Sequence, residues 1–225
     1  NYTPEHLETL TAFGEALALG FTRFFDFQRL EIQNRNLNTE RALERVRAEV
    51  FRMETSEDIT RIVEIIWEEL ENLGYELTRC SINIFDTERD FFGLYAVGTP
   101  AFADEVSTVP GVKLTDGRQM WILEQSLTGE GSPYRRDLVD AWQRGEVYKI
   151  ALTEPDLKAS ALAWFNRSTN SSLTLEGMPD AFYHYTPYRY GMIGVCSQNL
   201  DLDQFSEDDI ALFKRFGEAF GEGYT

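Results

Sequence analysis

Residues 4–53 read PEHLETLTAFGEALALGFTRFFDFQRLEIQNRNLNTERALERVRAEVFRM, and the interpretation of the whole chain starts from this stretch. It has no proline after Pro4, and its only glycines are Gly14 and Gly20. Apolar residues recur near the helical period, which predicts one long helix. Such a helix would span about 75 Å at about 1.5 Å per residue, more than the width of a small domain. The stretch predicts a rod that joins two domains and pairs with a partner chain. The alternative is a solvated amphipathic helix on its own domain.

The apolar pattern changes along this predicted helix. The first part carries a broad aromatic stripe, and the last part carries a narrow seam with coiled-coil spacing. A bare stripe of this size is seldom seen on a monomer, so we expect a homodimer with parallel helices. The expected interface residues are Phe13, Leu17, Phe21, Phe24, Leu43, Val46, Val50 and Met53, together with Phe216 and Phe220 of the last helix.

The two ends of the chain repeat one another. Residues 3–22 read TPEHLETLTAFGEALALGFT, and residues 206–225 read SEDDIALFKRFGEAFGEGYT. At an offset of 203 positions (216 − 13), Phe13–Ala16 falls on Phe216–Ala219, and Gly20 falls on Gly223. Glycine is unfavourable inside a helix, so its matched positions argue against a chance likeness of two amphipathic helices. The repeat predicts that residues 3–22 are the last helix of a preceding repeat.

Residues 1–54 are therefore expected to be a connector, and residues 55–225 one domain. Within the domain the patterns predict helices over 57–73, 134–144, 154–165 and from Ser206 onward, and strands over 78–85, 91–97, 120–127, 146–152, 181–188 and 190–197. In the first strand Cys80, Ile82 and Ile84 alternate with polar residues, so one face is expected to be buried. Residues 98–117 and 166–174 are expected to be loops. The order predicts an α+β domain with a six-stranded antiparallel sheet flanked by helices.

Composition excludes several classes of partner. The formal net charge is −17, whereas binding to a nucleic-acid backbone or to an anionic membrane surface needs clustered Lys and Arg. No run approaches the roughly 20 apolar residues of a membrane span. The two cysteines, Cys80 and Cys196, provide no disulfide framework and are expected to be buried, reduced thiols. We expect a cytoplasmic protein without nucleic-acid or membrane partners.

At this level of detail the chain resembles the GAF domain family, the small-molecule sensor modules of bacterial signalling proteins. The resemblance covers about residues 40–225 and is carried by the order of several short stretches. These are Ala42–Arg47, Ser56–Asp58, Cys80–Asp86, Ala141–Glu146, Tyr190–Val195 and Phe205–Asp209. It implies a GAF/PAS-like sheet and a regulatory role in a larger protein with tandem repeats, in which the connector resembles a signalling helix.

Catalytic and cofactor chemistry has little support in the sequence. The only histidines are His6 and His184, so a histidine metal site or a Ser-His-Asp set is not expected. Relatives with a covalent bilin use a cysteine beside a histidine, which neither cysteine here has. His184 as a lone haem ligand is a rarer role than packing. One GAF branch reduces methionine sulfoxide, but this needs accessible thiols rather than cysteines inside strands.

The resemblance implies a pocket between the sheet and the middle helices and loops, within about residues 98–118 and 146–186. The expected ligand-binding residues there are Trp121, Trp164, Phe165, Tyr183, His184 and Tyr185. Their rings offer apolar faces with hydrogen-bonding tips, although the same residues also suit an ordinary core. Three hypotheses follow: a non-catalytic ligand sensor that relays its state through dimeric terminal helices, a ligand-free GAF spacer in a dimer, and a thiol-based reductase.

Overall fold

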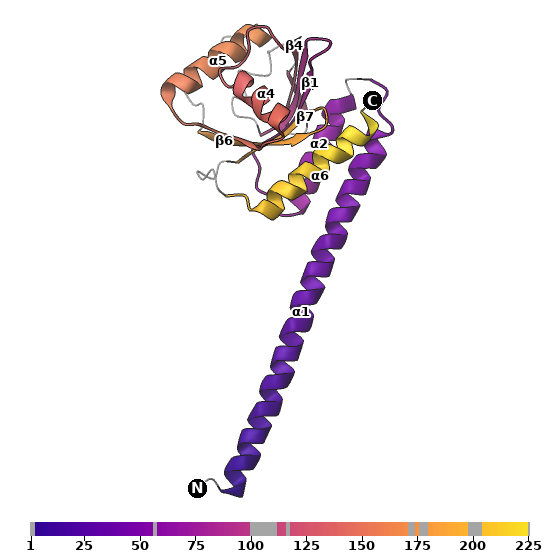
Figure 1. Ribbon diagram of the computed structural model, residues 1–225, viewed down its shortest axis with the longest axis vertical. Helices are drawn as coiled ribbons and strands as arrows, with labels where there is room; N and C mark the ends of the chain where they lie inside the picture. The colour runs from indigo at the N-terminus through magenta and orange to yellow at the C-terminus, as the bar shows by residue number, and fades with distance from the viewer. Residues whose placement is uncertain are drawn as a thin grey trace. The chain divides into compact units, whose positions relative to one another are not determined.

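The computed structural model describes residues 3–55, 58–99, 112–115, 118–170, 174–175, 180–197 and 204–224. The chain divides into two compact units, Asn1–Arg41 and Ala42–Thr225. Helix α1 (Pro4–Val50) contributes to both units (Figure 1). The second unit thus takes in the last turns of α1, upstream of the boundary expected at residue 55.

Helix α1 is continuous, as predicted, but it ends at Val50 rather than near Met53. The amide of Arg52 donates to the carbonyl of Glu49, and the amide of Met53 donates to that of Val50, at 2.9 and 3.1 Å. Such i to i−3 bonds tighten the last turn and end the regular helix. The carboxylate of Asp58 then accepts the amides of Glu54 and Thr55, both at 2.9 Å, which fixes the turn into the next helix.

In the first unit the large apolar side chains of α1 are exposed. Phe13, Leu17, Phe21 and Phe24 are each more than half exposed. Two of the neighbouring rings, Phe21 and Phe25, stack on one another with centroids 6.4 Å apart. This helix surface has no partner among the described residues of the chain.

The second unit is built on an antiparallel sheet with strand order β3-β4-β2-β1-β7-β6-β5. The strands are β1 (Arg79–Asp86), β2 (Phe91–Gly98), β3 (Val112–Thr115), β4 (Arg118–Ser126), β5 (Tyr148–Leu152), β6 (Ala181–Tyr188) and β7 (Gly191–Ser197). The helices are α2 (Asp58–Asn72), α4 (Arg135–Arg144), α5 (Pro155–Thr169) and α6 (Glu207–Gly223). The expected α+β class, with an antiparallel sheet flanked by helices, is confirmed. The six predicted strands correspond to all of these except β3, a short edge strand inside the stretch predicted as a loop.

Helices cover both faces of the sheet. On one face α2, α6 and the end of α1 pack on Ile82, Ile84 and Val195, and on the other α4 and α5 pack on Phe92 and Tyr183 (Figure 1). The prediction that the first strand is buried on one face only is wrong, because Ser81 and Asn83 are also buried. The polar side of β1 lies beneath α4 and α5.

The predicted loop at 166–174 also begins later than expected. Helix α5 continues to Thr169 and ends at Asn170, whose left-handed backbone (φ 52°) directs its amide to the carbonyl of Asn166. Asparagine tolerates this conformation better than most residues, so it suits a helix end. Residues 100–111, 116–117 and 171–173 of the two predicted loops lie outside the described residues.

The structure corrects six of the ten residues of the expected dimer interface. Leu43, Val46 and Val50 lie in the core of the second unit, as do Phe216 and Phe220 on the sheet-facing side of α6. Met53 is partly buried against the same core. The seam of α1 has coiled-coil spacing because α2 and α6 of the same chain pack against it. These residues are therefore not available to a second chain.

Leu43→Ala is expected to destabilise the second unit by about 2–5 kcal/mol, because it removes a fully buried side chain from the core. Urea unfolding followed by circular dichroism measures this change. Leu19→Ala, at a position 55% exposed on the same helix, is the matched control and is expected to stay within about 0.5 kcal/mol of wild type. Equal effects of the two substitutions would show that Leu43 is not a core residue.

Candidate functional site

The sheet face beneath α4 and α5 has small residues in its centre and large rings at its sides. One cross-strand row runs Trp121–Ala96–Ser81–Gly194–Tyr185 across β4, β2, β1, β7 and β6. A Cβ atom at Gly194 would lie 2.5 Å from the Ser81 hydroxyl and 2.6 Å from the Tyr185 ring. Glycine therefore lets that ring lie close to the sheet, and the row forms a hollow between two aromatic walls.

Helices α4 and α5 close this hollow into a cavity of about 50 Å³. Its lining comes from three sets of elements: strands β1, β2, β4 and β6, the start of α4 with the segment that leads into it, and helix α5. The lining residues are Arg79, Ser81, Asn83, Phe92, Leu94, Ala96, Trp121, Ser132, Tyr134, Arg135, Leu138, Trp164, Phe165, Tyr183 and Tyr185. No carboxylate is among them, although the whole chain is strongly acidic.

The structure brings five of the six predicted site residues together here. Trp121, Trp164, Phe165, Tyr183 and Tyr185 all line the cavity. His184 does not, because successive side chains of β6 point to opposite faces of the sheet. Its ring is fully buried on the other face and meets Phe205 edge-on, with centroids 4.8 Å apart. The histidine is thus separated by the sheet from the predicted pocket.

Arg79 lies at one side of the cavity among aromatic rings. One of its terminal nitrogens donates to the Tyr183 hydroxyl at 2.6 Å. The guanidinium carbon lies 4.5 Å from the centroid of the Trp121 ring and 5.6 Å from that of Tyr183. Cation–π contacts of this kind stabilise a desolvated guanidinium but leave its charge uncompensated. No carboxylate of the described residues forms an ion pair with Arg79.

Arg135 is a second guanidinium in the wall, and it is 4% exposed. It donates to the Gly129 carbonyl at 2.7 Å and to the Gln125 side chain at 3.3 Å, and it lies 5.0 Å from the Phe92 ring centroid. A Cβ atom at Gly131 would lie 1.9 Å from its Nε, so glycine is needed where the chain wraps around this side chain. Burial lowers the pKa of Arg135, and the negative charge of Asp90 opposes that shift. The guanidinium nevertheless stays protonated, because arginine does so throughout the physiological range.

The remaining polar groups of the wall are neutral. Burial raises the pKa of Tyr134, Tyr183 and Tyr185, so their hydroxyls keep their protons and are able to donate hydrogen bonds. The indole nitrogen of Trp164 is buried without a hydrogen-bond partner in the described part of the chain. Buried donors are usually satisfied, so an unsatisfied one beside a cavity indicates room for an acceptor.

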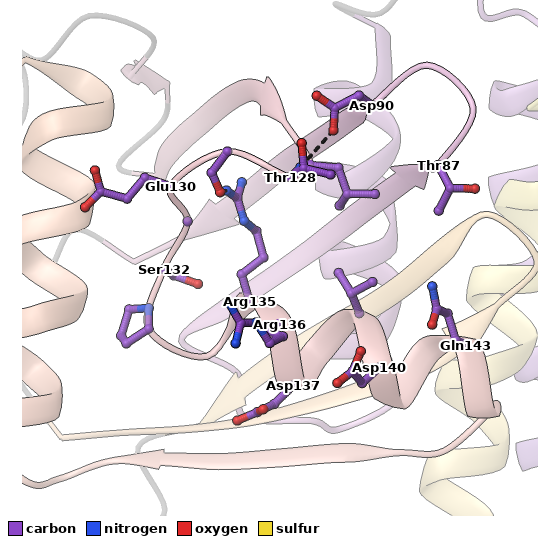
Figure 2. A pocket seen from close by; sticks show the side chains of 15 residues that line it. Thr87, Asp90, Thr128, Glu130, Ser132, Arg135, Arg136, Asp137, Asp140 and Gln143 are labelled. Carbon is purple, nitrogen blue, oxygen red and sulfur yellow. Dashed lines mark hydrogen bonds between the residues drawn. The ribbon is translucent and has the colours of Figure 1, made fainter.

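An open groove of about 730 Å³ adjoins the cavity and shares Ser132 and Arg135 with it. Figure 2 shows Arg135 extending from the start of α4 toward the segment that carries Thr128 and Glu130. The groove has mixed charge, and two of its four carboxylates, Asp90 and Glu130, are engaged. Asp90 accepts the Ser126 hydroxyl at 2.5 Å and the Thr128 amide at 2.8 Å, and Glu130 pairs with Arg167 at 2.7 Å. The groove is therefore less suited to selective binding than the enclosed cavity.

Sequence reasoning missed both arginines and the polar floor. The signal for the floor was the alternation of Arg79, Ser81 and Asn83 in the first strand, which was assigned to solvent. A solvated strand face usually carries long charged side chains, whereas serine and asparagine at its middle suit a buried face with hydrogen bonds. Arg135 had only the two preceding glycines, Gly129 and Gly131, as a signal.

The described ranges hold neither a metal-binding cluster nor a membrane-spanning helix. No group of three or more His, Cys, Asp and Glu side chains there is placed to hold a metal ion. None of the helices in those ranges combines the length and apolarity that crossing a bilayer demands. Comparison with known proteins adds no relative: no protein-family model matches the chain, and no curated protein is significantly similar to it.

Proposed function

We propose that the second unit is a regulatory domain of GAF type that binds a small carboxylate anion in the enclosed cavity. The observation that carries the proposal is the pair of guanidiniums, Arg79 and Arg135, in one aromatic cavity that has no carboxylate among its described lining residues. Burying a guanidinium without an ion-paired carboxylate is costly, so an arrangement of this kind is best explained by an anion that completes it. We propose that the domain belongs to a cytoplasmic bacterial signalling protein, as the family resemblance implies.

The size and shape of the cavity restrict the ligand. A water molecule needs about 10–15 Å³ of cavity measured in this way, so the cavity of about 50 Å³ accepts only a few heavy atoms. A planar carboxylate fits between flat rings and accepts paired N–H groups from a guanidinium. The hydroxyls of Tyr183 and Tyr185 and the indole N–H of Trp164 supply further donors. A larger acid would require α4 or α5 to shift.

A contact route leads from the cavity to the terminal helices. Asn83 lines the cavity, and its main-chain carbonyl accepts the Tyr188 hydroxyl at 3.3 Å. On the other face of the sheet the Tyr188 ring packs edge-on against Phe220 of α6, with centroids 5.8 Å apart. Helix α6 in turn is paired with the end of α1, where Arg47 contacts Glu222 at 2.8 Å. We propose that occupancy of the cavity is relayed to these helices along this route.

A ligand-free spacer is the second candidate function. The observation that favours it is the small volume of the cavity, since pockets for drug-sized ligands are typically several hundred Å³. A spacer would use the same helices but would have no use for uncompensated guanidiniums. A thiol reductase is disfavoured, because Cys80 and Cys196 are both buried.

The proposal retains a homodimer, with its interface reduced to the exposed part of α1. Of the residues expected from the sequence, Phe13, Leu17, Phe21 and Phe24 remain exposed. The proposed interface begins at Phe24 and runs to Ile32, and the large apolar side chains of this stretch are each more than half exposed. A parallel pairing of this stretch would remove an apolar surface larger than monomers usually show.

The ligand is tested with sodium acetate, formate, propionate and benzoate against sodium chloride at equal ionic strength. Acetate is expected to raise the thermal unfolding midpoint and to change the emission of Trp121 and Trp164, which line the cavity. Arg79→Met and Arg135→Met are each expected to weaken binding about tenfold to a hundredfold, because each removes hydrogen bonds to a charged group.

Arg136→Met is the matched control, since Arg136 is adjacent in sequence but lines only the open groove. It is expected to bind acetate as wild type does, and Arg135→Lys is expected to recover part of the affinity that Arg135→Met loses. The absence of binding by all four acids would leave the spacer as the better explanation. Equal losses in the Arg135→Met and Arg136→Met variants would place the anion in the groove.

Both thiols are expected to react slowly with a disulfide reagent at pH 8. Burial raises the pKa of Cys80 to about 12, and burial also raises that of Cys196, although Arg79 opposes the second shift. The thiolate fraction at pH 8 is therefore small, and it grows only as the pH rises toward these raised values. Labelling should become rapid and complete in guanidinium chloride. Labelling of the folded protein at the unfolded rate would restore the thiol reductase as a candidate.

The dimer is tested by sedimentation equilibrium at tens of micromolar protein. Wild type is expected to show twice the chain mass, and Phe24→Glu the monomer mass, with Gln33→Glu as a control for added charge on the same helix. Oxidation of a Leu30→Cys variant should link two chains only if the helices run parallel. A monomeric wild type would rule out the dimer, and a dimer that resists this cross-link would rule out parallel pairing.

A further inference from the structure

The exposed start of α1 and the buried helix α6 share their capping arrangement. At the start of α6, Ser206 accepts the Asp209 amide at 3.2 Å, and Asp209 accepts the Ser206 amide at 2.9 Å. At the start of α1, Thr3 and His6 exchange the same two bonds, each at a longer 3.4 Å. The offset from Thr3 to Ser206 is 203 positions, the same as that of the sequence repeat. The two helices therefore begin at equivalent residues.

Two of the three glycines of α6 lie where a Cβ atom would be crowded by the residues that the helix covers. A Cβ atom at Gly217 would lie 3.0 Å from Cβ of Tyr188, and one at Gly223 would lie 2.5 Å from Val50. At Gly221 the nearest atom of Tyr188 would be 3.4 Å away, an ordinary contact that leaves room for alanine.

The start of α1 follows this steric pattern position by position. Gly14 corresponds to Gly217 and Gly20 to Gly223, whereas Ala18 corresponds to Gly221. Glycine is thus kept at the two positions where a Cβ atom would be crowded and replaced at the one where it would make an ordinary contact. Nothing within 4 Å of Gly14 or Gly20 accounts for them, and glycine inside a helix is destabilising relative to alanine.

The faces of the two helices also agree in phase. The buried apolar positions of α6 are Leu212, Phe213, Phe216, Ala219 and Phe220, and their counterparts in α1 are Thr9, Leu10, Phe13, Ala16 and Leu17. The exposed positions Ala211, Lys214, Arg215, Glu218 and Glu222 correspond to Glu8, Thr11, Ala12, Glu15 and Leu19. Apart from Thr9 and Leu19, the segment is apolar where α6 is buried and polar or small where α6 is exposed.

We infer that residues 3–22 are a docking helix for a second sheet of this fold, and that they occupy on it the place that α6 occupies here. The partner would present a ring opposite Gly14, as Tyr188 faces Gly217, and a branched side chain opposite Gly20, as Val50 faces Gly223. A second copy of this chain does not offer that face, because its own α6 already covers it. The inference is independent of any ligand and uses a different part of α1 from the proposed dimer.

The test is a transplant within the full chain, in which residues 206–225 are replaced in register by the sequence of residues 3–22. The chimera is expected to unfold in a single cooperative transition and to keep the near-ultraviolet circular dichroism of packed aromatic rings. Two matched controls are expected to lose both properties: the same transplant carrying Gly14→Leu, and a transplant of residues 23–42, which is equally long and rich in apolar residues. Gly217→Leu in the native chain shows how much cooperative unfolding and near-ultraviolet circular dichroism are lost when a side chain blocks this contact.

A chimera without cooperative unfolding would overturn the inference, and so would a Gly14→Leu transplant that folds as well as its parent. A third result would also overturn it. If hydrogen exchange of the wild-type dimer shows residues 3–22 protected, and Phe24→Glu removes that protection, the segment is covered by a second copy instead of a sheet.

Discussion

The close approach of α6 to the sheet at Tyr188 is the contact on which the rest of the second unit depends. Because Gly217 has no side chain, the backbone of α6 lies close to Tyr188. The side chains of Phe213, Phe216 and Phe220 then reach the core. The same approach brings Gly223 against Val50, the last residue of α1. A larger residue at either glycine would lift the helix and expose the apolar face of the sheet. One steric requirement thus positions both terminal elements of the unit.

The opposite face of the sheet follows a different rule. There the small residues Ala96, Ser81 and Gly194 leave space that α4 and α5 close without filling. The walls are aromatic and carry two guanidiniums, so the proposed ligand is restricted by charge as well as by size. The two faces of the sheet therefore differ. One packs closely against helices, and the other borders a cavity lined by aromatic rings and guanidiniums.

The sequence predicted the fold class and most elements because their periodicities are strong and local. It assigned the Leu43–Val50 seam to a second chain, whereas the seam packs on helices of the same chain. The reason is that 3–4 spacing describes any two packed helices and does not say which chain supplies the second helix. It gathered five cavity residues correctly because aromatic rings cluster in the middle of the chain. It missed Arg79 and Arg135, whose roles arise only from strand register and from the wrap of the chain at Gly131. Their surroundings come from segments distant in the sequence.

The contrast between the acidic chain and its cationic cavity has a consequence for timing. An anion that diffuses toward a protein with a formal charge of −17 meets a repulsive field, which slows its association. Close to the guanidiniums the force reverses and retains it. Since a dissociation constant is the ratio of the dissociation rate constant to the association rate constant, a given affinity is then reached with slow dissociation as well as slow association. Such a domain would average over brief fluctuations in ligand concentration and respond to sustained ones.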